Sequence, residues 1–157
     1  MLERFTHAAR DVVRQAEEEA RERGSRTIEA EHLLLALAAP SSPVAPLLAE
    51  HGLDHDAVLE ALEREEERSL EAVGVSADAY GAPAPVRVAG RVRFGTSAKR
   101  ALERTLHEAQ LEGSKRLDAA HVLLGLLAAQ HGTVARALRM APVDQRRLRG
   151  AAAASVR

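Results

Sequence analysis

The chain has 157 residues, of which 46% are hydrophobic and only 2% aromatic. A core of one or two small domains must therefore be built from leucine, valine and alanine, a mixture that favours closely packed helices. Cysteine is absent, which excludes disulfides, thiolate metal sites and a cysteine nucleophile. The first residues carry charge where a signal peptide needs an apolar run, and no stretch approaches the roughly 20 apolar residues of a membrane span. These features predict a cytoplasmic protein without a membrane segment.

The net charge of −1 conceals an uneven distribution along the chain. Residues 1–78 contain 8 Lys/Arg and 18 Asp/Glu, a net of −10, whereas residues 79–157 contain 14 and 5, a net of +9. Attraction between the halves, attraction between copies and binding of two kinds of partner would each account for this asymmetry. Two separately solvated faces are the plainer alternative. No nucleic-acid partner is predicted.

A sequence repeat organises the chain. The stretch EAEHLLLALAA at Glu29–Ala39 returns as DAAHVLLGLLA at Asp118–Ala128, and the same offset aligns Phe5 with Phe94. Many further positions agree in order, so the chain is interpreted as a tandem duplication. Each unit is expected to fold as four helices.

The first unit carries clear helix signals. Alanines and valines at helical spacing predict a helix from about Thr6 to Arg23, ended by Gly24 as a left-handed cap. The leucine run that follows is apolar nearly all round, which predicts a buried second helix. A short third helix is expected over about 44–51. A fourth, capped by Asp54, is expected over about 57–70 with its EREEER segment facing water.

The second unit repeats this plan after a region rich in Pro and Gly. That region predicts a linker with a basic strap, in part extended, although a fully solvated linker is the plainer interpretation. Asp118 is expected to cap the second helix of this unit, and a last helix over about 144–154 is expected to fray. The predicted fold is all-α, with a first repeat at 1–73, a linker at 74–93 and a second repeat at 94–157.

A glycine-rich stretch invites a nucleotide-binding interpretation. GRVRFGTS at Gly90–Ser97 has the glycine spacing of a P-loop, but Thr96 stands where a lysine must reach the phosphates, and Lys99 comes too late. No alternation of strands and helices surrounds it, and no serine has the context of a nucleophile elbow. The chain is therefore predicted to be no enzyme and to need no cofactor.

The histidines invite a metal interpretation. His51 and His55 are four residues apart, but Gly52 breaks the helix between them, so they cannot share one helical face. His32 and His121 begin equivalent helices in separate units, where a histidine usually bonds to neighbouring backbone. No metal site is predicted.

Two long segments carry a family resemblance. FTHAARDVVRQAEEEARERGSRTIEAEHLLLALA, and later FGTSAKRALERTLHEAQLEGSKRLDAAHVLLGLL, resemble the double-repeat N-terminal domain of Clp ATPases, with the ClpC type the most similar. The resemblance covers about Leu2 to Leu148. It implies a pseudo-twofold bundle of eight helices that receives adaptors and substrate proteins for a Clp protease. The chain ends where the ATPase ring would begin, so a free-standing recognition domain is expected, with a piece of a larger ATPase as the alternative.

The resemblance also implies a ligand, because ClpC-type domains in some bacteria recognise phosphoarginine at one site per repeat. A carboxylate at the start of helix two pairs with the guanidinium, while a threonine and a basic residue on helix one meet the phosphate. In the first repeat the matching residues are Thr6, Arg10 and Glu31. In the second they are Gly95, Lys99 and Ala120. The second repeat lacks the threonine and the carboxylate, so one working site is expected; simple helix capping is the alternative for the first set.

The resemblance implies a second function, the sequestration of cyclic-peptide antibiotics that target these domains. The matching face is Leu2, Phe94 and Lys99, where Leu2 replaces the usual phenylalanine and removes an aromatic contact. A third alternative is a regulatory or oligomerising protein that uses its acidic and basic halves.

Overall fold

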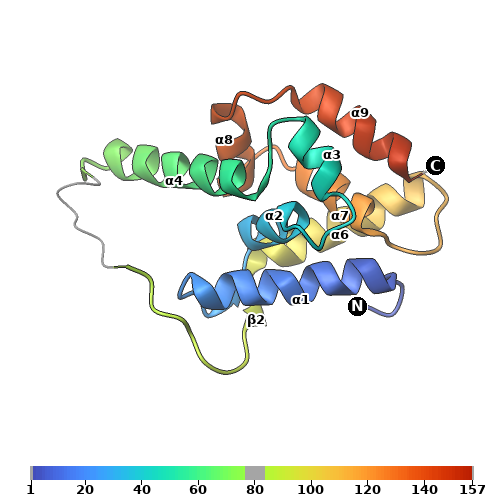
Figure 1. The fold of residues 1–157 in the computed structure, drawn as a ribbon, viewed down its shortest axis with the longest axis horizontal. Helices are drawn as coiled ribbons and strands as arrows, with labels where there is room; N and C mark the ends of the chain where they lie inside the picture. The colour runs from blue at the N-terminus through green and yellow to red at the C-terminus, as the bar shows by residue number, and fades with distance from the viewer. Residues whose placement is uncertain (1, 77–83, 157) are drawn as a thin grey trace.

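Two four-helix repeats make up the structure (Figure 1). This computed structural model describes residues 2–76 and 84–156. The first repeat contains α1 (His7–Glu22), β1 (Thr27–Ile28), α2 (Ala30–Ala38), α3 (Ala45–Glu50) and α4 (His55–Ala72). The second contains β2 (Arg93–Phe94), α6 (Thr96–Leu111), α7 (Ala119–Leu127), α8 (Thr133–Met140) and α9 (Gln145–Ser155). The predicted all-α fold with four helices in each repeat is confirmed for the described residues.

Local signals fix the ends of several helices. Thr6 caps α1 by accepting a hydrogen bond from Ala9 N at 3.2 Å, and Asp54 caps α4 in the same way. Asp118 is the N-cap of α7, as predicted. Gly24, just beyond α1, has a φ of 71°, the left-handed conformation that glycine adopts without a Cβ clash.

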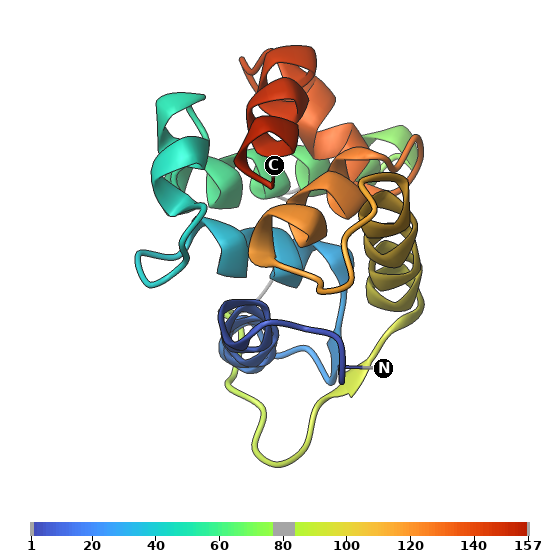
Figure 2. The same ribbon diagram turned by 90° about the vertical axis from the view of Figure 1, so that its right-hand side faces the viewer.

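The core is centred on α2 and α7, which carry the repeated leucine run. Leu33, Leu35 and Leu37 of α2, and Leu123 of α7, are all 0% exposed. Figure 2 shows these two helices enclosed by α1 below, α6 to the right and α9 above. The prediction that the apolar run forms the buried central helix of each repeat is confirmed, because a helix that is apolar all round needs neighbours on every side.

The repeats are joined crosswise. The segment before α1 pairs with the segment before α7 through a parallel bridge between Phe5 and Leu117. The segment before α6 pairs with the segment before α2, because β2 lies parallel to β1 with Ile28 opposite Phe94. Each repeat therefore places the start of its first helix beside the start of the other repeat's second helix.

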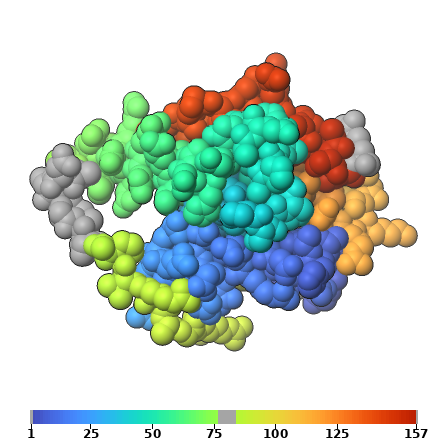
Figure 3. Space-filling view, in the orientation of Figure 1, coloured from blue at the N-terminus to red at the C-terminus, as the bar shows by residue number. Residues whose placement is uncertain are grey.

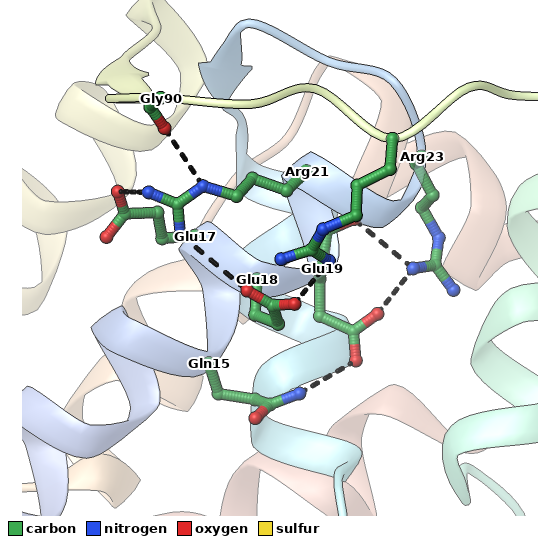
Figure 4. A network of polar contacts seen from close by, with 8 residues as sticks. Gln15, Glu17, Glu18, Glu19, Arg21, Arg23 and Gly90 are labelled. Atoms are coloured by element: carbon green, nitrogen blue, oxygen red, sulfur yellow. Dashed lines mark hydrogen bonds and ion pairs between the residues drawn. The ribbon is translucent and has the colours of Figure 1, made fainter.

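Residues 84–92, here called the basic strap, lie against α1. Arg87 forms an ion pair with Glu18, and Arg21 Nε donates a hydrogen bond to Gly90 O at 3.0 Å (Figure 4). Val92 is only 6% exposed. Most residues of the strap are exposed, so the strap is solvated as interpreted, but these contacts tie it to α1; the predicted extended part is confirmed at β2. Residues 77–83 of the predicted linker lie outside the described residues.

The charged segment of α4 does not face water throughout, contrary to the prediction. Glu65 is 5% exposed and accepts hydrogen bonds from Arg136 Nε at 2.9 Å and from Ser69 Oγ at 2.7 Å. The reason is that α8 packs against α4 and brings its arginine to that face. Together with the strap, this pair shows direct attraction between the acidic and basic halves of one chain.

The last helix, α9, is also better ordered than the sequence predicts. Leu148 and Ala152 are 0% exposed, and the helix packs against α7 and α3. Arg149 adds an ion pair with Glu108 of α6 at 2.8 Å. The expected fraying is therefore wrong, because the small apolar face of α9 covers the core.

Candidate functional site

The two repeated histidines are structural. His32 Nδ1 accepts a hydrogen bond from Glu29 N at 2.9 Å, and His121 Nδ1 accepts one from Asp118 N at 2.9 Å. The predicted bonding to neighbouring backbone is confirmed. Burial lowers the pKa of both histidines below the ordinary value, so each ring is neutral near pH 7 with its proton on Nε2. The rings therefore stabilise the starts of α2 and α7.

The N-terminal ends of α1 and α6 are each met by a carboxylate from the other repeat. Thr6 Oγ1 donates to Asp118 Oδ1 at 3.0 Å, and Ser97 Oγ donates to Glu29 Oε1 at 2.8 Å. A Cβ added at Gly95 would lie 1.9 Å from Glu29 Oε2, so this carboxylate lies directly against the start of α6. The anion position that a helix N-terminus offers is thus filled by the protein itself.

The structure does not group Thr6, Arg10 and Glu31 at one place. Thr6 and Arg10 lie at the start of α1, beside Asp118. Glu31 comes after the C-terminal end of α1. This helix has 16 residues, so its two ends are about 24 Å apart. Glu31 lines two hollows, neither of which is lined by Thr6 or Arg10, and shares one of them with Thr96. The crosswise joining of the repeats explains this separation.

The second predicted set is divided in the same way. Gly95 is the N-cap of α6 and lies against Glu29, and Lys99 follows it at the start of the helix. Ala120 is 3% exposed in α7, next to Asp118, and so belongs to the junction with Thr6. The ligand-binding role of both sets stays a prediction.

A hollow of about 600 Å³ lies where α2, α6 and α8 begin. We call it the inter-repeat hollow, because α2 belongs to the first repeat and the other two helices to the second. Its polar lining includes Glu31, Thr96, Arg100, Arg104, His131 and Thr133.

Glu31 and Arg104 of the inter-repeat hollow are partly stripped of water, whereas Arg100 is exposed. Burial raises the pKa of Glu31, and the nearby carboxylates of Glu29 and Glu65 raise it further. Burial lowers the pKa of Arg104, and the adjacent charge of Arg100 adds to this effect. Among the described residues Glu31 forms no ion pair with either arginine. The hollow therefore holds a carboxylate and two guanidinium groups that would each gain from a ligand of opposite charge.

Sequence reasoning missed Arg100 and Arg104. A usable signal exists, because both lie on the face of α6 that begins with Thr96, at successive steps of four residues. Finding it required knowing that this face meets α2 of the other repeat.

The residues of the predicted cyclic-peptide face lie before α1 and around the start of α6. Leu2 is half-buried before α1, where its carbonyl accepts a hydrogen bond from Phe5 N at 3.1 Å. Phe94 is half-buried in β2, beside Ile28, and Lys99 is exposed on α6. The cyclic-peptide face stays a prediction.

His51 and His55 are also held by protein groups. His51 Nδ1 lies 2.9 Å from Leu47 O, and His55 Nε2 lies 2.7 Å from Glu19 Oε1. Over residues 2–76 and 84–156, no group of three or more His, Cys, Asp or Glu side chains could hold a metal ion. Within the same part of the chain, no helix is both long enough and apolar enough to cross a membrane.

Two helical repeats that meet crosswise, with a charged hollow at their junction, place the chain in the class of double-repeat helical domains. Residues 4–91 and 93–157 each match the family described as Clp repeat (R) N-terminal domain, and the chain belongs to this family. The resemblance stated from the sequence is thereby confirmed.

Relatives of known name support the family. The chloroplastic chaperone protein ClpC1 of Oryza sativa subsp. japonica is 31% identical over 150 residues, which cover 95% of this chain and 15% of the relative. A probable ATP-dependent Clp protease ATP-binding subunit of Chlamydia pneumoniae is 30% identical over 150 residues, 95% of this chain and 16% of the relative. The chain thus spans about 15% of the length of such relatives.

Solved structures agree on the fold. The N-terminal domain of the chaperone ClpD from Arabidopsis thaliana has a TM-score of 0.72 at 20% identity, with both chains covered to 100%. The Hsp104 N-terminal domain from Candida albicans has a TM-score of 0.64 at 21% identity, covering 96% of this chain and 89% of that one. At such identities the likeness shows the fold alone.

Proposed function

We propose that this chain is a recognition domain that binds adaptors or substrate proteins of a Clp-type unfoldase and has no catalytic step of its own. Membership of the Clp repeat family supports the proposal, as do relatives named as chaperones and as ATP-binding subunits of Clp proteases. ATPase or peptidase activity in the purified chain would contradict it.

The finer proposal is that phosphoarginine on a client protein binds in the inter-repeat hollow. One observation carries this proposal. A desolvated carboxylate, Glu31, shares one hollow with two like-charged guanidinium groups, Arg100 and Arg104. Phosphoarginine carries a guanidinium and a phosphate on one side chain. Glu31 accepts hydrogen bonds from the guanidinium, while the arginines donate to the phosphate oxygens.

This site differs from the arrangement expected within one repeat. The carboxylate comes from α2 of the first repeat and the phosphate-binding groups from α6 of the second. The equivalent junction beside Thr6 has Ala120 in place of the carboxylate, so we expect one site per chain. In this mode of binding, the hydrogen bonds of Asp118 at the start of α1 and of Glu29 at the start of α6 stay intact.

Titration calorimetry tests the proposal directly. The whole chain is titrated with a peptide that carries one phosphoarginine, and with matched peptides that carry arginine or phosphoserine at that position. We expect one site for the phosphoarginine peptide and no measurable heat for the others. Glu31→Gln and Arg100→Gln should each weaken binding about tenfold or more, since a charge-assisted hydrogen bond contributes about 1.5–3 kcal/mol.

Arg10→Gln is the matched control, because Arg10 is an exposed arginine on the first turns of α1, at the other junction. It should change the affinity by less than about twofold. Two equivalent sites, or an equal loss in Arg10→Gln and Arg100→Gln, would contradict the assignment. An absence of binding would remove phosphoarginine and leave the coarser recognition function in place.

A further inference from the structure

A second hollow lies on the other side of α2, between α4, the C-terminal end of α1 and the basic strap. Figure 3 shows the recess between the green surface of α4 and the blue and yellow-green surfaces of α1 and the strap. Its volume is about 880 Å³. We call it the acidic groove and define it by a leucine floor and an acidic rim, which are Leu35, Leu59, Leu62, Glu22, Glu63 and Glu66.

The fold leaves part of the leucine floor open. Leu35 is 0% exposed, whereas Leu59 and Leu62 are only partly buried against the core. Leu59, Leu62, Glu63 and Glu66 recur at helical spacing, so one face of α4 presents leucines and carboxylates together. A segment laid in the groove could cover the leucines and approach the carboxylates at the same time.

The rim is negative, and two of its three carboxylates form no ion pair. Within the described residues neither Glu63 nor Glu66 forms an ion pair, and both side chains are exposed. Arg23 also lines the groove, but it is bound to the buried carboxylate of Glu19 at 2.5 Å. His32 is neutral near pH 7, because burial lowers its pKa. The groove therefore presents net negative charge to solvent.

The basic strap shows how a segment can lie on this acidic surface. Arg87 pairs with Glu18 of α1, and Val88 N donates a backbone hydrogen bond to Arg21 O at 3.0 Å. Pro85, just before these residues, forms part of the groove wall. An extended basic segment thus already docks on the surface that continues into the groove.

We propose that the acidic groove binds a segment of a partner protein in which arginine or lysine alternates with leucine-like side chains. The cations meet Glu22, Glu63 and Glu66, and the apolar side chains cover Leu59 and Leu62. The strap does not take this place, because its own contacts hold it on α1. Binding here needs neither a phosphate nor the arginines of the inter-repeat hollow, although Glu31 and Thr133 line both hollows.

Fluorescence anisotropy with a labelled synthetic peptide of alternating arginine and leucine tests the proposal. Two further peptides replace arginine by glutamate or leucine by serine. The wild-type chain should bind the first peptide and should bind both control peptides at least tenfold more weakly, a difference of about 1.4 kcal/mol. If charge alone drove binding, the arginine–serine peptide would bind as well as the first peptide. If apolar contact alone drove it, the glutamate–leucine peptide would do so.

A pair of double variants locates the site. Glu63→Lys with Glu66→Lys should weaken binding at least tenfold, a loss of about 1.4 kcal/mol. Glu103→Lys with Glu112→Lys makes the same charge change on exposed positions in α6 and at its C-terminal end, outside the groove lining, and should cost less than about threefold, as expected of screened surface charges. Thermal melts check that both variants are folded.

Several results would overturn the proposal. Equal losses in the two double variants would show that binding follows net charge rather than the groove. Failure of the wild-type chain to bind the arginine–leucine peptide would remove the site. If the wild-type chain self-associates and the Glu63→Lys, Glu66→Lys variant does not, the groove binds a second copy of the chain instead. Arg100→Gln should leave peptide binding unchanged, so failure of the phosphoarginine site is distinguishable from failure of this one.

Discussion

Gly125 lies in the middle of α7, where this helix packs against α6. A Cβ added there would lie 2.4 Å from Thr105 Oγ1, 2.7 Å from Thr105 N and 2.8 Å from Ala101 O. Favourable contacts of a carbon atom begin near 3.5 Å. Because two of the three atoms belong to the backbone, α6 itself must move to admit a methyl group. We therefore expect Gly125→Ala to destabilise the fold.

The magnitude follows from two opposing effects. Overpacking a well-filled contact costs about 1–3 kcal/mol. Replacing glycine by alanine in a helix interior returns about 0.5–1 kcal/mol. The backbone clash places the cost at the upper end, about 2–3 kcal/mol. The net loss in the free energy of unfolding is therefore about 1–2.5 kcal/mol, which lowers the melting temperature by roughly 2–10 °C for a chain of this size.

Urea and thermal unfolding measure this change, with Gly150→Ala as the matched control. Gly150 lies within α9 with no atom near the added Cβ, so alanine there should be neutral or stabilise by up to about 1 kcal/mol. Thr105→Ala in the Gly125→Ala background should recover part of the loss, because it removes one of the three clashes. A Gly125→Ala chain as stable as the wild type would refute this account of the α6–α7 contact.

Two further predictions concern buried polar groups. In urea unfolding, Glu65→Ala should lower the free energy of unfolding by about 1 kcal/mol, because the hydrogen bonds from Arg136 and Ser69 are lost. Glu67 is exposed on the same helix, so Glu67→Ala should change this free energy by less than about 0.5 kcal/mol. Burial lowers the pKa of His121, so below the ordinary value of about 6.5 the unfolded chain binds more protons and stability falls as the pH drops. Urea midpoints across this range should show the slope, and His121→Gln should reduce it; an equal slope in both proteins would contradict the assignment.

Features encoded locally could be predicted from the sequence. The helices follow from apolar spacing, and their ends from residues such as Thr6, Asp54 and Gly24 that act within one turn. The role of His32 was also predictable, because its hydrogen bond reaches back only three residues.

Features that depend on distant partners could not be predicted in the same way. Glu65 looks solvated in the sequence because Arg136, which draws it inward, lies 71 residues away. The strap looks like a linker because its arginine finds Glu18 only after the chain has folded back on α1.

The candidate site shows the same limit. Sequence reasoning selected Glu31 as a ligand residue and combined it with Thr6 and Arg10 of its own repeat, whereas Glu31 lines hollows that neither of them lines. The pairing of the segments before the helices joins the repeats crosswise and brings Arg100 and Arg104 to Glu31 instead. Side chains on one helix face are predictable from spacing, whereas the helix that they face across a repeat boundary is not.

The central claim is that recognition is built across the two repeats, and a double-mutant cycle on phosphoarginine-peptide affinity tests it most directly. Glu31→Gln is combined with Arg100→Gln in one cycle and with Arg10→Gln in the other, and each affinity is measured by titration calorimetry. We predict a coupling energy of about 0.5–3 kcal/mol between Glu31 and Arg100, and additivity within about 0.5 kcal/mol between Glu31 and Arg10. Coupling of Glu31 to Arg10 with additivity toward Arg100 would contradict the claim.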